Sequence, residues 1–381
     1  MKRRLDSADR CNYGRATMRR RRVLVMRAGS GASNNLVRSL RAGNPSLVVV
    51  GCHHDPFVLR ASTADRSYLI PAWRERGALR VLREVATRER IDLVLPTSDE
   101  DVRVLSAPGH PLRGLVFLPC HATVEICQDK YRLVRRLRAR GVRAPRTAPV
   151  QRLDGLRGLW NTLGGAGYLW CRMRRGAGSL AAIPVRTPEQ ARGWIQYWVE
   201  MRGASVRDFT LAEYLPGRDF AVQSLWKDGR LVLLKTTERV SYFQGTSRPS
   251  GVSSIAALHK TVTEPLVAET AAAAVRAVDR RASGAFSVDL KEDRTGRPSV
   301  TEINAGRFLT GTSIFDLTGK RNMAAMYVRL GTGERVSVRQ PYDATVGHYM
   351  IRDLDARPVL ISASEIAGSA IGKAVKPSLT A

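Results

Sequence analysis

FSVDLKEDRTGRPSVTEINAGRF, residues 286–308, is the stretch that decides the fold of this chain. Both halves alternate apolar and polar residues, as half-buried β-strands do, and the glycine and proline between them favour a turn. A hairpin folded symmetrically about residues 295 and 296 places Asp289 directly opposite Glu302. Asn304 follows two residues later and therefore shares a face of its strand with Glu302.

Two carboxylates in directly opposed positions repel one another, because their Cβ atoms lie about 4.5–5.5 Å apart on an antiparallel pair. A cation held between Asp289 and Glu302 would remove that repulsion. Oxygen ligands alone, with the Asn304 amide as the third, suit a hard ion such as Mg²⁺. The residues alone leave a second interpretation open, in which the hairpin is solvated and carries its charges on an outer face.

The motif of Asp289, twelve residues and then Glu302-Ile303-Asn304 resembles the metal-binding hairpin of the ATP-grasp superfamily. Its spacing is similar to that of D-alanine–D-alanine ligases, and its surroundings are closer to the carbamoyl-phosphate synthase large chain and its stand-alone relatives. The resemblance implies ATP and two Mg²⁺ ions, or Mn²⁺ in their place, held by Asp289, Glu302 and Asn304. It also implies a fold of α/β and α+β parts, the ATP-grasp fold with an N-terminal Rossmann-like preATP-grasp domain.

The composition fits a globular α/β enzyme, because 381 residues with 44% hydrophobic residues and 32 glycines can bury the cores of two or three lobes. No apolar run reaches the length of a membrane span, so we expect a soluble protein without a membrane partner. The five cysteines are scattered and form no CxxC pair, which argues against a disulfide framework or a zinc site. A reducing, cytoplasmic location is therefore predicted.

The formal charge of +28 raises nucleic acid as a partner. However, the arginines are spread over the whole length and are not interleaved with aromatic residues, and no nucleic-acid motif is visible. We therefore expect no specific nucleic acid partner, and only nonspecific adhesion at low salt. The sequence leaves the oligomeric state open, a homodimer included.

Residues 1–19 are polar and basic, and they predict a disordered arm or a misassigned start with Met18 as the first residue. Between residues 20 and 125, a strand, a glycine turn and a helix follow one another, as in nucleotide-binding α/β folds. This segment resembles the preATP-grasp domain, which in ligases of this class helps to hold the carboxylate or amine substrate. Within it, Ser98 and Asp101 resemble a capping box at a helix start.

Residues 126–330 are predicted to form the ATP-grasp domain, two α+β lobes with ATP between them. Lys130 lies in the first turn of a helix, where a cation opposes the helix dipole and a phosphate would offset that cost. A strand that carries Arg172 then runs into a glycine-rich turn, which the residues alone also allow to be a plain β-hairpin. The resemblance makes this turn a lid over the triphosphate. It implies ATP contacts from Lys130, Arg172, Gly176, Gly178 and Ser179.

The sequence EYLPGRD, residues 213–219, resembles the adenine hinge of ATP-grasp folds. The resemblance places Glu213, Tyr214 and Leu215 at the adenine and Asp219 at the ribose hydroxyls. The residues alone also allow an edge strand followed by a polar turn.

Three basic residues are predicted to be catalytic. Lys235 and Arg239 lie four residues apart and so share one face of a predicted strand, which in relatives faces the phosphates. Arg307 resembles the arginine that steadies the transferring phosphoryl group, although many relatives have it one residue earlier.

The resemblance implies an ATP-dependent carboxylate–amine ligase, which activates a small-molecule carboxylate as an acylphosphate and joins it to an amine or another nucleophile. An ATP-binding protein or subunit with weak or lost catalysis stays open, because Met173 stands where most relatives have proline and Arg307 is shifted. A basic nucleic-acid-binding protein stays open on charge alone. Residues 331–381 are expected to form an appended segment with a short strand pair.

Overall fold

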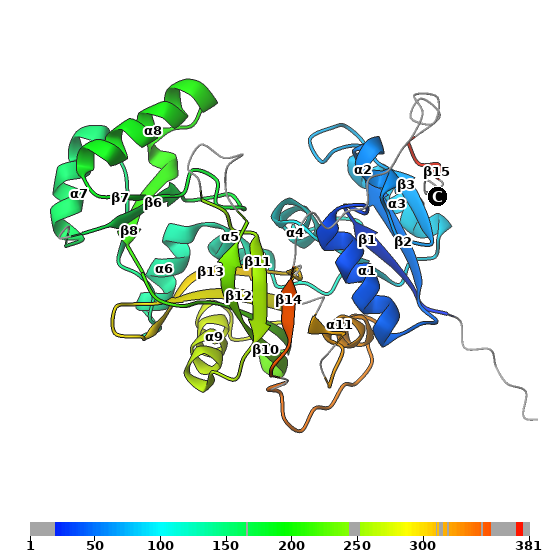
Figure 1. Ribbon diagram of the computed structural model, residues 1–381. Helices are drawn as coiled ribbons and strands as arrows, with labels where there is room; N and C mark the ends of the chain where they lie inside the picture. The colour runs from blue at the N-terminus through cyan, green and yellow to red at the C-terminus, as the bar shows by residue number, and fades with distance from the viewer. Residues whose placement is uncertain are drawn as a thin grey trace, which may run out of the picture.

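The computed structural model describes residues 20–164, 167–243, 252–309, 311, 315–317, 320–343, 346–351 and 371–375, and the predicted arm 1–19 lies outside them. Three sheets organise the described chain. In Figure 1 the five-stranded sheet lies at the right, the six-stranded sheet in the centre and the four-stranded sheet at the upper left. In the described part of the chain, no helix combines the length and apolar character needed to cross a membrane.

The five-stranded sheet has the order β15-β3-β2-β1-β4, and β1 to β4 are parallel. The bounds are Arg22–Met26 for β1, Val48–His53 for β2, Arg66–Leu69 for β3, Leu93–Leu95 for β4 and Ala374–Val375 for β15. Side chains of β1 alternate between the two faces, so Val23 packs with α1 (Gly31–Gly43) while Leu24 packs with α3 (Ala78–Arg88). This helix–sheet–helix layering is that of nucleotide-binding α/β folds, as predicted for residues 20–125.

The polar residues at the carboxyl edge of this sheet cap the helices that follow. Ser30 caps α1, and Asp55 caps α2 (Pro56–Arg60). The predicted capping box is confirmed, because the Ser98 hydroxyl accepts from the Asp101 N–H while the Asp101 carboxylate accepts from the Ser98 N–H. The remaining helices of this region are α4 (Asp99–Ser106), the short 3₁₀ helix η1 (Arg113–Leu115) and α5 (His121–Gln128).

The six-stranded sheet is antiparallel, with the order β13-β12-β9-β10-β11-β14. Its bounds are Asp219–Lys227 for β9, Arg230–Tyr242 for β10, Ala256–Thr261 for β11, Gly284–Glu292 for β12, Pro298–Ala305 for β13 and Tyr349–Ile351 for β14. Phe286 and Ile303 pack against α6 (Lys130–Arg138) and α9 (Pro265–Val278). The alanine-rich helix α9 thus packs beneath the hairpin and ends at Val278.

The four-stranded sheet has the order β5-β8-β6-β7 and is also antiparallel. Its strands are β5 (Thr147–Pro149), β6 (Leu169–Met173), β7 (Ile183–Val185) and β8 (Phe209–Glu213). Helices α7 (Leu156–Thr162) and α8 (Pro188–Arg202) pack on it through Trp160, Ile195 and Trp198. Two short 3₁₀ helices, η2 (Leu153–Gly155) and η3 (Val206–Asp208), complete this lobe.

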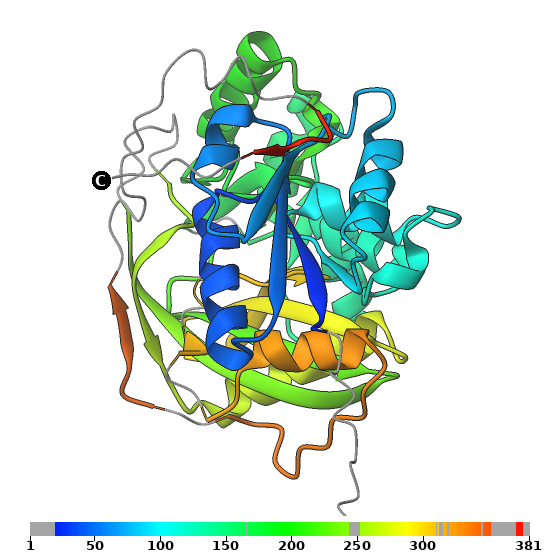
Figure 2. The same cartoon turned by 90° about the vertical axis from the view of Figure 1, so that its right-hand side faces the viewer.

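The last described segments return to the sheets. Helix α11 (Met323–Gly331) crosses α1 (Figure 2), where an added Cβ on Gly43 would lie 2.5 Å from the Asn322 side chain. Strand β14 pairs with β11, and β15 pairs with β3. The strand expected in the tail therefore extends the six-stranded sheet rather than pairing within the tail, because the edge of β11 offers free hydrogen-bonding groups.

Candidate active site

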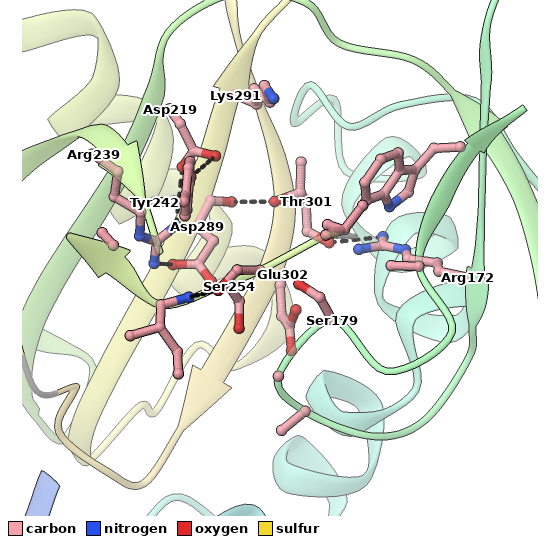
Figure 3. A pocket seen from close by; sticks show the side chains of 18 of the residues that line it. Arg172, Ser179, Asp219, Arg239, Tyr242, Ser254, Asp289, Lys291, Thr301 and Glu302 are labelled. Carbon is pink, nitrogen blue, oxygen red and sulfur yellow. Dashed lines mark hydrogen bonds and ion pairs between the residues drawn. The ribbon is translucent and has the colours of Figure 1, made fainter. Parts of the chain in front are cut away.

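A cavity of about 740 Å³ lies between the four-stranded and six-stranded sheets. Its walls come from β6, the glycine-rich loop after it, the end of β8, and strands β9, β10, β12 and β13. All predicted site residues except Lys235 line this cavity: Lys130, Arg172, Gly176, Gly178, Ser179, Glu213, Tyr214, Leu215, Asp219, Arg239, Asp289, Glu302, Asn304 and Arg307. Figure 3 shows the part of the cavity around Asp289 and Glu302.

The hairpin β12–β13 has the predicted register, with Asp289 directly opposite Glu302. A bulge follows, because the next pair is Leu290 with Val300 and leaves Thr301 as the extra residue. The Thr301 hydroxyl donates to the Asp289 carbonyl at 3.1 Å, and the Asn304 amide donates to the Asp289 carboxylate at 3.4 Å. The bulge thus turns an additional backbone carbonyl toward the cavity next to the two carboxylates.

Burial raises the pKa of Asp289 to about 6; the nearby Arg239 guanidinium opposes this shift, and the Glu302 carboxylate adds to it. The repulsion expected between opposed carboxylates is therefore present. It is a physical reason for a cation at this point of the hairpin.

Arg239 supplies a positive charge between two strands. Its guanidinium donates to Asp289 at 2.6 Å and to Asp219 at 2.9 Å, and its side chain is only 12% exposed. The second oxygen of Asp219 accepts a hydrogen bond from the Tyr242 hydroxyl at 2.5 Å (Figure 3). Burial opposes the charge of Arg239, but the Asp289 and Asp219 carboxylates raise its pKa overall, so it stays a cation. Asp219, predicted at the ribose, lines the cavity and also holds Arg239 and Tyr242.

Lys130 lies where the glycine-rich loop meets the metal hairpin. Asp129 caps α6 by accepting hydrogen bonds from the N–H groups of Tyr131 and Arg132, which places Lys130 in the first turn, as predicted. The Lys130 ammonium donates to the Gly176 carbonyl at 2.7 Å and lies 3.4 Å from the Glu302 carboxylate. The ammonium therefore touches both the loop and a predicted metal ligand.

The loop itself depends on glycine. Gly176 and Gly178 have φ values of 113° and 71°, and Ser179 follows at 57°. A side chain at the first two positions would be strained, so only this composition lets the backbone turn tightly over the cavity.

Arg172 is 8% exposed and donates to the Thr301 carbonyl at 3.0 Å. Burial lowers its pKa, while the Glu302 and Asp289 carboxylates raise it. Among the described residues, its buried Nε has no hydrogen-bond partner. A buried donor without a partner costs free energy, so Arg172 is suited to an anionic ligand in the cavity.

An aromatic group lines the end of the cavity near the predicted hinge. The Tyr214 ring lies 5.4 Å from the Tyr168 ring and 6.3 Å from that of Trp170. The Lys291 ammonium stands 6.0 Å from the Tyr214 ring centre. Flat aromatic faces suit a heterocyclic base, while a neighbouring cation suits its acceptor atoms.

Arg307 joins the hairpin to the first lobe. Its Nε donates to Asp99 at 2.6 Å, and its terminal nitrogen donates to the Asn304 side-chain oxygen at 2.6 Å. Burial opposes its charge, yet Asp99 raises the pKa of Arg307 overall. Arg307 is thus a fixed cation next to the third predicted metal ligand.

The structure does not bring Lys235 into this cavity. Its ammonium donates to the Asp316 carboxylate at 2.6 Å and to the Arg321 carbonyl at 2.7 Å, and it lies 3.6 Å from Asp343. Lys235 and Arg239 share a strand face, as predicted, but the cavity ends before it reaches Lys235. These contacts hold the Lys235 ammonium in a buried cluster, so the structure does not bring Lys235 together with the other predicted site residues.

Two cavity residues, and one residue outside the cavity lining that holds Arg307, were missed by sequence reasoning. Lys291 lies two residues after Asp289 on the same strand face, so alternation alone could have found it. Tyr242 follows a bulge in β10, where alternation fails. Asp99 contacts Arg307 through tertiary packing, and no local pattern predicts that contact.

The donor set fits a hard cation. Among the described residues, no group of three or more His, Cys, Asp and Glu side chains could hold a metal ion. The predicted set has two carboxylates, Asp289 and Glu302, and the Asn304 amide oxygen, so any ion held there needs further oxygen ligands from water or phosphate. A cationic side chain contacts an oxygen of each of these three residues, so the oxygens stand in positions that favour a positive charge.

No family model matches the sequence, and no curated protein matches it either. Solved structures do match. An L-amino acid ligase from Bacillus licheniformis is 15% identical with a TM-score of 0.63, and the match covers 83% of this chain and 75% of that one.

Two further structures match over a similar share of the chain. The biotin carboxylase domain of Hydrogenobacter thermophilus 2-oxoglutarate carboxylase, in complex with MgADP, ADP and bicarbonate, is 15% identical with a TM-score of 0.65, covering 86% of this chain and 73% of that one. The other is an N5-carboxyaminoimidazole synthase from Aspergillus clavatus in complex with ADP and 5-aminoimidazole ribonucleotide. It is 16% identical with a TM-score of 0.60, and the match covers 85% of this chain and 80% of that one. At these identities, the similarity establishes a shared fold.

Proposed function

We propose that this chain, which has the ATP-grasp fold, is an ATP-dependent ligase that activates a small-molecule carboxylate and joins it to an amine or another nucleophile. The predicted ATP-grasp fold is confirmed by the solved structures that match it. The activity is supported by one observation above all. The opposed carboxylates Asp289 and Glu302 lie in the same cavity as Lys130 and as Arg172, whose buried Nε is unpartnered among the described residues.

The nucleotide fits this cavity in one direction. The phosphates would lie at Lys130, Arg172 and the glycine-rich loop, since both cations line the cavity next to a loop whose glycines allow close backbone approach. The adenine would lie at the opposite end, against Tyr214 and beside Leu215. Cations and aromatic rings thus both line the cavity, as the phosphates and the base of ATP require.

Asp289, Glu302 and Asn304 would hold two Mg²⁺ ions, or Mn²⁺ in their place, together with the phosphates. Bound there, such ions supply charge neutralisation on the phosphate oxygens. The matched complex with MgADP supports this assignment.

The reaction that we propose has two steps. A carboxylate oxygen of the substrate bonds to the γ-phosphorus while the bond to the bridging β-phosphate oxygen breaks, which yields an acylphosphate and ADP. The amine nitrogen then attacks the acyl carbon, phosphate leaves, and the amine loses a proton to solvent. Phosphoryl transfer depends mainly on positioning and charge, so this site needs no nucleophilic side chain.

Different residues would bind the phosphates and stabilise the charge of the transferring group. Lys130 and Arg172 would orient the phosphates, and Arg307, fixed by Asp99 and Asn304, would steady charge at the transferring group. Small-molecule substrates would enter from the side of Arg307. A cytoplasmic location and the absence of a specific nucleic acid partner belong to the same proposal, and a homodimer is compatible with it.

The test is carboxylate- and amine-dependent release of ADP and phosphate, measured on purified protein with MgATP and panels of both substrates. We expect ADP release to rise only when a matching carboxylate is present, and the ligated product to appear by mass spectrometry when the amine is added. Failure to bind ATP in the presence of Mg²⁺ would refute the proposal. Tight ATP binding without turnover on any pair would favour the alternative of an ATP-binding protein with lost catalysis.

A further inference from the structure

The predicted metal ligands are each in contact with a cation of the protein itself. Asp289 and Asn304 accept hydrogen bonds from two arginines, and Glu302 forms an ion pair with a lysine. The distances are 2.6 Å from Asp289 to Arg239, 2.6 Å from Asn304 to Arg307, and 3.4 Å from Glu302 to Lys130.

Arg239 is the most firmly held of these cations. It lies directly opposite Asp219 in the β9–β10 register, so its backbone fixes it next to that carboxylate. Asp219 holds one guanidinium nitrogen and Asp289 the other, while the Tyr242 hydroxyl fixes the orientation of Asp219. Figure 3 shows Arg239 pointing from its own strand across to Asp289 on the hairpin. The strand register and these hydrogen bonds therefore fix the guanidinium next to Asp289.

This arrangement determines the electrostatic environment of a divalent ion that approaches Asp289 and Glu302. An ion that approached Asp289 without a nucleotide would face the fixed charge of Arg239 on the same carboxylate. It would also have to compete with Lys130 for Glu302. Like charges in a poorly solvated site repel strongly, so the free chain offers the ion little net attraction.

A nucleotide changes this balance. Its phosphates carry several negative charges, and Lys130 and Arg172 line the same cavity within reach of them. Once Lys130 turns to a phosphate, Glu302 loses its protein cation and becomes available to a metal ion. The phosphates also offset the charge of Arg239.

We propose that Arg239 is a resident cation that keeps divalent metal out of the nucleotide-free site, so that metal binds this chain only together with the nucleotide. The inference rests on the proposed function, because it takes Asp289 and Glu302 as ligands of the metal that accompanies ATP. By linkage, metal and nucleotide raise one another's affinity by the same factor.

The test measures Mn²⁺ binding to the full chain without nucleotide, by the electron paramagnetic resonance signal of free Mn²⁺. The unmodified chain should show no saturable Mn²⁺ binding over the concentrations tested. Arg239→Met should bind Mn²⁺ with a dissociation constant at least about tenfold below the highest of those concentrations. Adding Asp289→Asn to Arg239→Met should remove that gain, which would locate the ion at the hairpin. Arg239→Lys keeps the charge and should behave as the unmodified chain does, and Arg140→Met, a change at an exposed arginine, should have no effect.

Two outcomes separate this inference from the proposed function. MgADP binding to the unmodified chain, measured by calorimetry, tests the nucleotide site alone, and its absence would refute the proposed function. If MgADP binds but Mn²⁺ binds the nucleotide-free chain as tightly as it binds folded Arg239→Met, the inference is wrong. If Arg239→Met does not fold, Arg239→Gln removes the charge, retains hydrogen-bond donors and carries the same expectations.

Discussion

Asp99 accepts a hydrogen bond of 2.6 Å from Nε of Arg307, although 208 positions separate the two residues in the chain. Asp99 opens α4 in the first lobe, and Arg307 follows the hairpin of the six-stranded sheet. The contact therefore connects the first lobe to the predicted catalytic centre. Arg307 also donates to Asn304, so Asp99 orients a residue that touches the metal ligands.

We expect Asp99→Asn to slow turnover by loosening Arg307, while the dissociation constant for ATP changes little. The loss of a charge-assisted hydrogen bond should lower the free energy of unfolding by about 1.5–3 kcal/mol. Steady-state kinetics, calorimetry and urea denaturation measure the three effects. Glu100→Gln, at the neighbouring and half-exposed position, is the matched control and should leave turnover intact. Equal losses in both variants would argue against a positioning role for Asp99.

Glu302→Gln should abolish ATP turnover while the protein stays folded. The opposed pair needs both charges to hold a divalent ion, and glutamine keeps the shape of Glu302 but not its charge. ADP release measures the effect, and far-ultraviolet circular dichroism confirms folding. The control is Glu269→Gln, which changes an exposed carboxylate on α9. Full turnover in folded Glu302→Gln would remove the hairpin from the mechanism.

Arg172→Ala should weaken ATP binding by about 1.5–3 kcal/mol, because it removes a charge-assisted contact to phosphate. Adenosine carries no phosphate, so its affinity should barely change. Calorimetry with both ligands measures the difference. Asp219→Ala should weaken both ligands if Asp219 contacts the ribose, although it also removes the acceptor of the hydrogen bond from Arg239. Equal weakening of adenosine and ATP in Arg172→Ala would withdraw the phosphate-lid assignment of residues 172–179.

Glu89 should make the stability of the first lobe pH-dependent. Although burial opposes its charge, hydrogen bonds from Tyr68, Arg66 and Arg22 lower the pKa of Glu89 overall. A carboxylate whose folded pKa is lowered contributes stability above its unfolded pKa, and that contribution is lost as the pH falls through the folded value.

Glu89→Gln should therefore cost about 1.5–3 kcal/mol near pH 7, and the difference from the unmodified chain should shrink below about pH 4.5. Urea denaturation at a series of pH values measures it. Glu84→Gln, at an exposed position that pairs with Arg80 along the helix, should show little effect at any pH. If the loss of unfolding free energy in Glu89→Gln stayed constant down to the lowest pH measured, the charge of Glu89 would not be its cause.

The charge of +28 should produce only weak DNA binding, independent of sequence and lost at physiological salt. A salt titration with two unrelated duplexes of equal length tests this expectation. Tight binding to one sequence at physiological salt would instead support a nucleic-acid-binding protein.

The sequence predicted what local chemistry determines. Strand alternation and one turn sufficed to oppose Asp289 and Glu302, because both strands of the hairpin are contiguous in the chain. Side-chain caps such as Asp129 were predictable for the same reason.

Long-range packing was not predictable in this way. Alternation placed Lys235 on the face of Arg239, yet Asp316 and Asp343, far along the chain, take its ammonium away from the cavity. Asp219 was assigned to a ribose by its motif, and only the β9–β10 register shows that Arg239 stands opposite it. A bulge in β10 also moved Tyr242 out of the simple alternation.

The late strands β14 and β15 also shape how the chain reaches its fold. During synthesis, β11 and β3 are made long before the strands that pair with them. Tyr68 of β3, for example, pairs with Ala374 of β15. Until then β11 and β3 are themselves edge strands, and an edge strand is a template for pairing with another chain. Pairings so distant in sequence also slow folding, because the entropy of closing the intervening loop is lost before the contact forms. The pairings of β14 with β11 and of β15 with β3 are therefore expected to form late in folding.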